Sequence, residues 1–232
     1  LEAALSAVTG RWERSVCLGD MVGYGPDPNE VVDRIRGLVA VAIRGNHDKA
    51  ACGLADAEDF NPVAKTAANW TRDHLRPDNL NYLQQLPQGP LSADGMAIVH
   101  GALHDEDEYV FAPAQALDGL LESPSPVTFF GHTHFQGGFS YRESKMEVIQ
   151  LRPEAGISFA ALRVEPDTRY LLNPGSIGQP RDGDPRAAFA IADLDHRVIE
   201  FWRVPYDIEA VQQRMKSAGL PEPLILRLAF GR

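Results

Sequence analysis

Short apolar runs alternate with segments of helical periodicity along the first part of the chain. A helical spacing of apolar residues runs from Leu1 to Val8. Further helices are predicted at 29–38, 62–86 with a break at Pro77, and 113–121, and strands at 15–18, 39–43, 96–99 and 127–130. This alternation of strands and helices is typical of an α/β domain.

From Met146 onward the pattern changes to closely spaced strands. They are predicted at 146–151, 157–164, 169–172, 187–192 and 198–204. A final helix follows Asp207 as N-cap, and its apolar face, formed by Ile208, Val211 and Met215, is expected to pack on a sheet. Because the sequence has no internal repeat and no long linker, we predict one domain over 1–232 with two sheets.

Composition narrows the classes of partner. The 232 residues carry a formal net charge of -10, which argues against binding nucleic acid through a broad basic surface. No apolar run approaches the roughly 20 residues that span a bilayer, so no membrane partner is expected. Cys17 and Cys52 form no disulfide framework, which favours reduced thiols and a cytoplasmic location. A phosphate-bearing ligand would therefore need a local cationic centre.

Four of the predicted strands end in the same way, with glycine next to a potential metal ligand. These residues are Asp20, the run Asn46-His47-Asp48, His100, and the pair His132 and His134. The carboxyl ends of neighbouring strands meet at one crevice in an open α/β sheet, so the side chains are expected to gather there. A nitrogen and oxygen set without thiolate suits Mn, Fe, Zn or Ni. In an extended backbone, His132 and His134 would leave the same face.

The same residues carry a resemblance to a known family. In their order along the chain, the motifs at 19–20, 45–48, 100 and 131–134 resemble those of the calcineurin-like metallophosphoesterases. The longer stretches 19–31 and 173–186 resemble the small bacterial and archaeal phosphodiesterase-like branch of that family. The resemblance implies a four-layer α/β/β/α sandwich with two divalent metal ions. It also implies hydrolysis of phosphodiesters or small organic phosphates by a metal-bound hydroxide.

Residue roles follow from the matching positions. The resemblance implies that Asp20 bridges the two metals and that His134 binds the first. The second metal would be completed by Asn46, His100 and His132. His47 matches the proton donor of the family, whereas Asp48 either orients His47 or caps the helix that follows.

Two departures from the family pattern leave alternatives open. The first motif, Asp-x-His on the first strand, is absent, so we expect that strand to precede Leu1 in a longer chain. The alternative is a degenerate metal site in a non-catalytic binding module. The protein phosphatase motif is also altered at Gly23 and Tyr24, which leaves Arg181 and Arg186 as phosphate-binding candidates unless they form ordinary salt bridges. A dinucleoside polyphosphate hydrolase is a further alternative, and the sequence predicts no oligomeric state.

Two other groups of residues have competing interpretations. Four aromatic residues either wall a pocket for a nucleobase or aryl group or contribute to packing, namely Tyr24, Tyr109, Phe111 and Phe135. The acidic run at 105–108 is expected to be a solvated loop, or else to repel large polyanions from the cleft.

Overall fold

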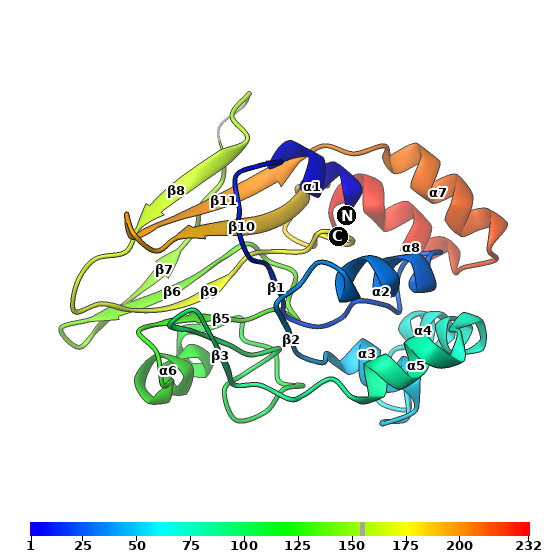
Figure 1. Ribbon diagram of the computed structural model, residues 1–232, viewed down its shortest axis with the longest axis horizontal. Coiled ribbons are helices and arrows are strands. Elements are labelled where there is room, and N and C mark those ends of the chain that lie inside the picture. The colour runs from blue at the N-terminus through cyan, green and yellow to red at the C-terminus, as the bar shows by residue number, and fades with distance from the viewer. Residues whose placement is uncertain (154–155) are drawn as a thin grey trace.

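The computed structural model describes residues 1–153 and 156–232, which form three sheets (Figure 1). The strands β1 (Val16–Cys17) and β2 (Val41–Ala42) make a parallel pair. The largest sheet has the order β3 (Leu91–Ala93), β4 (Met96–Ile98), β5 (Val127–Phe129), β9 (Arg169–Asn173), β6 (Gly137–Arg142) and β7 (Lys145–Ile149). The third sheet has the order β10 (Ala187–Asp193), β11 (Val198–Val204) and β8 (Phe159–Arg163).

The centre of the six-stranded sheet is parallel, and this orientation places the functional loops. Strand β4 pairs with β5, and β5 with β9, in parallel register, with Ala97 opposite Thr128 and Thr128 opposite Leu171. Parallel strands end at the same edge of a sheet. The segments that follow β4 and β5 therefore emerge side by side, next to the ends of β1 and β2.

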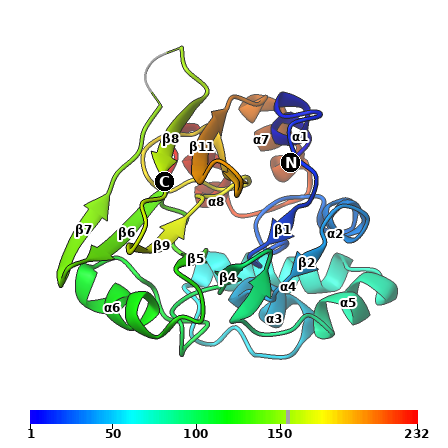
Figure 2. The same ribbon diagram turned by 60° about the vertical axis from the view of Figure 1, so that its left-hand side comes forward.

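Helices surround the sheets. They are α1 (Glu2–Ala7), α2 (Pro28–Arg36), α3 (Asn46–Cys52), α4 (Pro62–His74), α5 (Pro77–Gln84), α6 (Pro113–Glu122), α7 (Ile208–Ser217) and α8 (Glu222–Arg227), followed by the 3-10 turn η1 (Leu228–Phe230). The break expected at Pro77 separates α4 from α5, with proline in the first turn of the second helix. Figure 2 shows α2 to α5 beside β1 and β2.

Apolar clusters define four layers. Between the two larger sheets, Phe129 and Leu172 pack in one buried cluster with Phe201. The opposite face of the six-stranded sheet is covered by α6, through Leu120 against Leu171. On the outer face of the three-stranded sheet, α1 packs in a cluster with Trp202. The order is therefore helix, sheet, sheet, helix.

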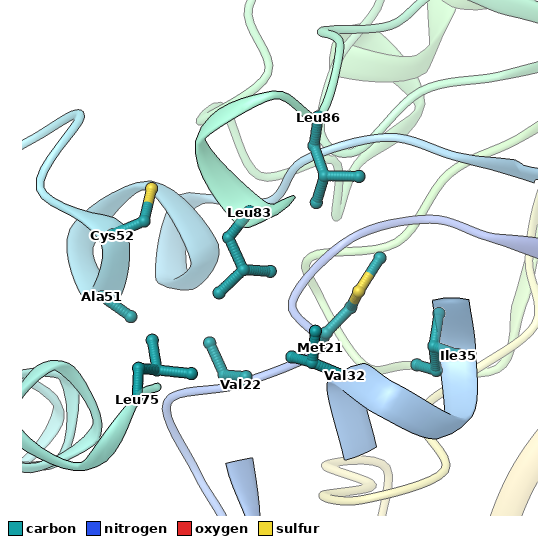
Figure 3. Close-up of a cluster of buried hydrophobic side chains, with 9 residues drawn as sticks. All are labelled: Met21, Val22, Val32, Ile35, Ala51, Cys52, Leu75, Leu83 and Leu86. Atoms are coloured by element: carbon teal, nitrogen blue, oxygen red, sulfur yellow. The ribbon is translucent and has the colours of Figure 1, made fainter. Parts of the chain in front are cut away.

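A separate cluster joins the loop after β1 to the neighbouring helices (Figure 3). Met21 and Val22 lie in this cluster with Val32 on α2 and Leu83 on α5. These side chains are buried, so the loop that begins at Asp20 is held by packing on both sides. The packing fixes the backbone next to the metal-ligand candidates.

Several local expectations were wrong or incomplete. The apolar face of α7 packs on helices rather than a sheet, because Met215 lies in a cluster with Ala67 of α4 and Leu224 of α8. The sequence pattern did not predict β3 or β6, and it gave no bounds for the short helix α3 that it expected after Asp48. Strand β6 begins with two glycines whose backbones lie against neighbouring strands, so its periodicity is weak.

In the described part of the chain, no helix combines the length and apolarity needed to cross a membrane.

Candidate metal centre

The candidate ligands lie just beyond the ends of neighbouring strands. Asp20 follows β1, and Asn46 is the first residue of the helix after β2. His100 follows β4, while His132 and His134 follow β5. The convergence predicted from sequence is thus what the topology produces.

Three of these side chains form a compact cluster. Asp20, His100 and His132 each offer one ligand atom, and these atoms lie within 4.8 Å of one another. The carboxylate of Asp20 faces two directions. Its Oδ1 is 3.4 Å from Nε2 of His100, and its Oδ2 is 4.0 Å from Nε2 of His134. Asn46 completes one side, with its Oδ1 3.3 Å from the same nitrogen of His100.

The backbone at three ligands differs from the extended geometry expected for the histidine pair. Asp20 has φ 55°, His132 has φ 61° and His134 has φ 62°. Asp and His tolerate this left-handed region better than most residues, and such strain is often found at functional sites. The two histidines therefore reach the centre from a turn rather than from one face of a strand.

Backbone carbonyls fix the tautomer of the three histidines that are ligand candidates. His100 donates through Nδ1 to Leu18 O at 2.6 Å, and His134 donates through Nδ1 to Gln179 O at 2.7 Å. In His132 the roles are reversed, since Nε2 donates to Asp107 O at 3.0 Å. Metal-binding imidazoles in proteins are commonly oriented in this way, with one ring nitrogen on the metal and the N–H of the other donated to a fixed acceptor.

The remaining nitrogen of His132 provides a test of whether a metal fits. Its Nδ1 is buried and has no hydrogen-bond partner among the described residues. A buried imidazole nitrogen without a partner is costly unless something else satisfies it. Because His132 belongs to the cluster with Asp20 and His100, a divalent cation fits both the position and the chemistry of the donor set.

Electrostatics keep these groups in the ligating forms. Burial lowers the pKa of His132 to about 3 and also lowers the pKa of His134. Burial opposes ionisation of Asp20, but the neighbouring imidazoles of His100, His47 and His134 hold its pKa well below its usual range. A negative Asp20 carboxylate beside neutral imidazoles at His132 and His134 is a state that binds a divalent cation.

Asp48 anchors backbone rather than an imidazole. Its buried carboxylate accepts N–H groups from Gly45 (2.9 Å), Asp20 (2.7 Å), Met21 (2.9 Å) and Val22 (3.3 Å). Burial and the nearby Asp20 carboxylate raise the pKa of Asp48 to about 7, against the lowering effect of these N–H groups. It caps α3 from the third helical position, with Gly45 as the N-cap, and ties that helix to the Asp20 loop.

His47 lies beside the ligands in an aromatic setting. Its ring stacks on Tyr24 with centroids 4.1 Å apart and packs against Phe60 at 4.7 Å. Burial lowers its pKa to about 4, and its Nδ1 has no hydrogen-bond partner in the described parts of the chain. Tyr24 donates its hydroxyl to Oδ2 of Asp20 at 2.9 Å, a contact that the sequence analysis did not foresee.

The two arginine candidates differ in their surroundings. Arg181 lies near the site, with its guanidinium 5.9 Å from the Tyr24 ring and its backbone N–H bonded to His134 O at 3.2 Å. It donates from Nε and Nη2 to Oε1 of Gln179. Arg186 instead pairs with Asp184, with Nη2 2.6 Å from Oδ2. The salt-bridge alternative describes Arg186 in this structure.

The acidic run at 105–108 is not simply solvated. Glu106 pairs with Arg44 at 2.9 Å and with Lys49 at 2.8 Å, and Asp107 pairs with Lys49 at 2.6 Å. The backbone carbonyl of Asp107 is the one that orients His132. The run therefore connects the candidate metal centre to α3. The sequence, which shows only four consecutive acidic residues, did not predict this role.

Comparisons with known proteins find relatives that match most or all of the chain. The sequence model of one protein family, the calcineurin-like phosphoesterase superfamily domain, matches residues 1–197. An uncharacterized protein of Methanocaldococcus jannaschii, MJ0912, is 31% identical and is matched over 100% of this chain and 93% of its own length. A crystal structure of a metallophosphoesterase from Sphaerobacter thermophilus is 38% identical with a TM-score of 0.82, covering 100% of this chain and 93% of that one. The hypothetical protein PH1004 from Pyrococcus horikoshii shares the fold, with a TM-score of 0.74 and 20% identity over 99% of this chain and 89% of its own.

Proposed function

Because the chain belongs to the calcineurin-like phosphoesterase superfamily, we propose that it hydrolyses phosphodiesters or small organic phosphates at a site for two divalent metal ions. The family and fold that the motifs predicted are confirmed. The observation that carries the activity is the cluster of Asp20, His100 and His132, whose ligand atoms lie within 4.8 Å of one another.

The two oxygens of Asp20 support a role between two cations. Oδ1 lies on the side of His100 and Asn46, whereas Oδ2 lies on the side of His134. We assign Asn46, His100 and His132 to one metal, His134 to the other, and Asp20 to both. Two divalent cations held there would supply Lewis-acid activation of the phosphoryl group and of the attacking water.

Other residues serve the substrate. Arg181 is assigned to an anionic phosphoryl oxygen, because a guanidinium binds such oxygens with charge-assisted hydrogen bonds. His47 is assigned to proton transfer at the leaving oxygen. Its imidazole is neutral in the free protein, and an anionic phosphoester beside it would raise its pKa and favour the protonated form. Asp48 acts by holding the Asp20 loop on α3.

The donor set limits the choice of metal without fixing it. Imidazole nitrogen, carboxylate oxygen and amide oxygen are present, and no thiolate takes part in the cluster within the described ranges. This combination suits Mn, Fe, Zn or Ni rather than a metal held by cysteine. Elemental analysis of protein purified without added metal would identify the native cations.

Hydrolysis of an activated aryl phosphodiester and of the matching monoester, assayed with Mn²⁺, tests the proposal. We expect turnover that a chelator abolishes, and a fall in kcat/KM of about 100-fold or more in Asn46→Ala. Asn81→Ala removes an asparagine on the exposed surface of α5, whose side chain bonds only Gln85 in the described parts of the chain. This variant should leave kcat/KM unchanged.

The outcomes separate the alternatives. No turnover with Mn²⁺, Fe²⁺, Zn²⁺ or Ni²⁺, together with intact metal binding, would contradict the proposal and favour a non-catalytic binding module. Chromatography of the products from a dinucleoside polyphosphate would distinguish cleavage within the polyphosphate chain from cleavage of a simple ester.

A further inference from the structure

Three large aromatic side chains remain exposed next to the metal centre. Tyr109 is 40% exposed, Phe111 is 55% exposed and Phe135 is 43% exposed. Their rings touch in series, with centroids 5.4 Å apart between Tyr109 and Phe111 and 5.6 Å apart between Phe111 and Phe135. We call these three residues the aromatic platform.

The platform is continuous with the metal ligands. The Tyr109 ring stacks on the imidazole of His132, with centroids 3.8 Å apart and planes 20° apart. At the other end, Phe135 directly follows His134 in the chain. A group lying on the platform would thus be a neighbour of a phosphate held at the metal centre.

Hydrogen bonds hold the platform backbone in place. The backbone N–H of Phe111 donates to Oε1 of Gln115 at 3.0 Å, and that of Phe135 donates to Oγ1 of Thr133 at 3.3 Å. The segment before Tyr109 is tied down by the ion pairs of Lys49. An ordered ring surface costs little further entropy when a planar ligand stacks on it.

The platform complements the charged part of the site. Cations held by the metal ligands would suit an anionic phosphate, as does Arg181, whereas the platform offers ring faces and edges that prefer a flat, apolar or π-electron group. Exposed aromatic residues that touch one another beside a polar centre are typical of a ligand-binding surface rather than of scattered surface residues.

We propose that the aromatic platform binds a planar aromatic group, a nucleobase or an aryl ring, that the substrate carries next to its phosphoester. This inference rests on the proposed phosphoesterase function for the position of the phosphate. It names the substrate class: phosphate esters with an aromatic substituent are preferred over alkyl phosphates and sugar phosphates.

Equilibrium dialysis with Mn²⁺-loaded protein tests this preference without requiring turnover. One arm compares 5′-AMP with ribose 5-phosphate, and the other compares phenyl phosphate with methyl phosphate. Stacking of one base contributes about 1–3 kcal/mol, so we expect the aromatic member of at least one pair to bind about tenfold more tightly.

Variants separate stacking from other effects. We expect Phe111→Ala and Phe135→Ala to reduce the affinity ratio severalfold, and Phe111→Leu to do so as well because it keeps an apolar side chain without a ring. Leu194→Ala is the control. Leu194 is 49% exposed and lies with Met96 and Val127 at the start of β4 and β5, at the opposite ends of these strands from the site. Its affinity ratio should match the wild type.

Each outcome has a distinct meaning. A preference in the nucleotide arm alone assigns a nucleobase, and a preference in both arms assigns aromatic rings in general. Equal affinities within both pairs, or ratios that Phe111→Ala and Phe135→Ala leave unchanged, overturn the proposal. If these variants instead change the molecular mass in light scattering and no preference exists, the platform is a protein interface. A retained preference without hydrolysis contradicts the phosphoesterase function and leaves the platform as a binding site.

Discussion

Gly45 lies against two residues of the candidate metal centre, Asp20 and His100. A Cβ at this position would collide with Oδ1 of Asp20 and lie only 2.6 Å from Cε1 of His100. The backbone of Asp20 would also be too close, at 2.5 Å from its nitrogen. Since Asp20 is held by Asp48 and the packing of Met21, the clash cannot be relieved by a free side-chain rotation.

Gly45→Ala is therefore expected to damage both the metal site and the fold. We expect a loss of about 1–3 kcal/mol in the free energy of unfolding and a large fall in bound metal. Urea denaturation and elemental analysis measure the two effects. Gly25→Ala provides the control, because a Cβ there meets nothing within 4 Å. Full metal content in Gly45→Ala would contradict this account of the site.

Burial sets the protonation of two imidazoles in the folded chain. It lowers the pKa of His47 to about 4 and that of His132 to about 3, whereas an unfolded histidine has a pKa of about 6.5. Because the folded values lie below the unfolded value, each group's contribution to stability is complete above about pH 6.5. The contribution is then lost as the pH falls toward 4 for His47 and toward 3 for His132.

Nitrogen-15 NMR of the histidine side chains checks this prediction in metal-free protein. At pH 5.5 we expect neutral imidazoles at His47 and His132 in the folded state. In urea at the same pH, both should be mainly protonated, since the unfolded pKa is about 6.5. A protonated His132 signal in the folded protein at pH 5.5 would contradict the predicted effect of burial.

At the scale of elements, the 105–108 segment connects α3 to the turn after β5. Lys49 on α3 bonds both Glu106 and Asp107, and the backbone carbonyl of Asp107 accepts a hydrogen bond from the ring Nε2 of His132. A carbonyl that orients a metal-binding imidazole influences metal affinity even though it does not touch the metal. The position of the segment should therefore matter for binding at His132.

Lys49→Met removes this anchor while retaining most of the side-chain volume. We expect the affinity for Mn²⁺ to fall about tenfold, because outer contacts of metal ligands typically contribute 10- to 100-fold. Isothermal titration calorimetry measures the affinity. Lys65→Met provides the matched control, since among the described residues Lys65 pairs only with the exposed Glu58. Equal affinities for Lys49→Met and Lys65→Met would show that the segment does not position His132.

The sequence was most informative where a local signal decides the structure. Asp207 caps α7 as expected, with its carboxylate accepting the N–H of Ala210, and Pro77 starts a new helix. Non-local contacts were not readable in the same way. The left-handed turn at His132 and His134 departs from simple alternation, and nothing in the apolar spacing of α7 reveals that its partners are α4 and α8.

In the candidate site, too, local sequence signals were predictive and non-local contacts were not. Glycine and ligand motifs at strand ends were sufficient to predict that Asp20, Asn46 and three histidines converge, because parallel strands end at one edge. The supporting contacts were missed: Tyr24 on Asp20, and the Asp107 carbonyl on His132. A tyrosine and a backbone carbonyl carry no motif, so only the folded chain shows which ligand each one touches.

At the scale of the whole molecule, the candidate metal centre connects parts of the chain that are far apart in sequence. The loop after β1 supplies Asp20, the helix after β2 supplies Asn46, and the turn after β5 supplies His134. These elements lie beside the sandwich of two sheets, in which helices cover both outer faces (Figures 1 and 2). A pair of ions that share Asp20, one bound by Asn46 and the other by His134, would cross-link the loops at one end of the sheets.

Metal binding should therefore stabilise the entire fold. A ligand that binds only the native state stabilises it by about 2.7 kcal/mol at 100 times its Kd, and for a chain of this size 1 kcal/mol shifts Tm by roughly 2–4 °C. Saturating Mn²⁺ should thus raise the Tm of chelator-treated protein by about 5–10 °C in scanning calorimetry. Asn46→Ala should reduce this shift and Asn81→Ala should preserve it, because only Asn46 lies against His100 in the cluster. An equal shift in both variants would mean that the stabilising ion binds elsewhere, since removal of an oxygen donor beside Asp20 cannot leave binding at this centre unaffected.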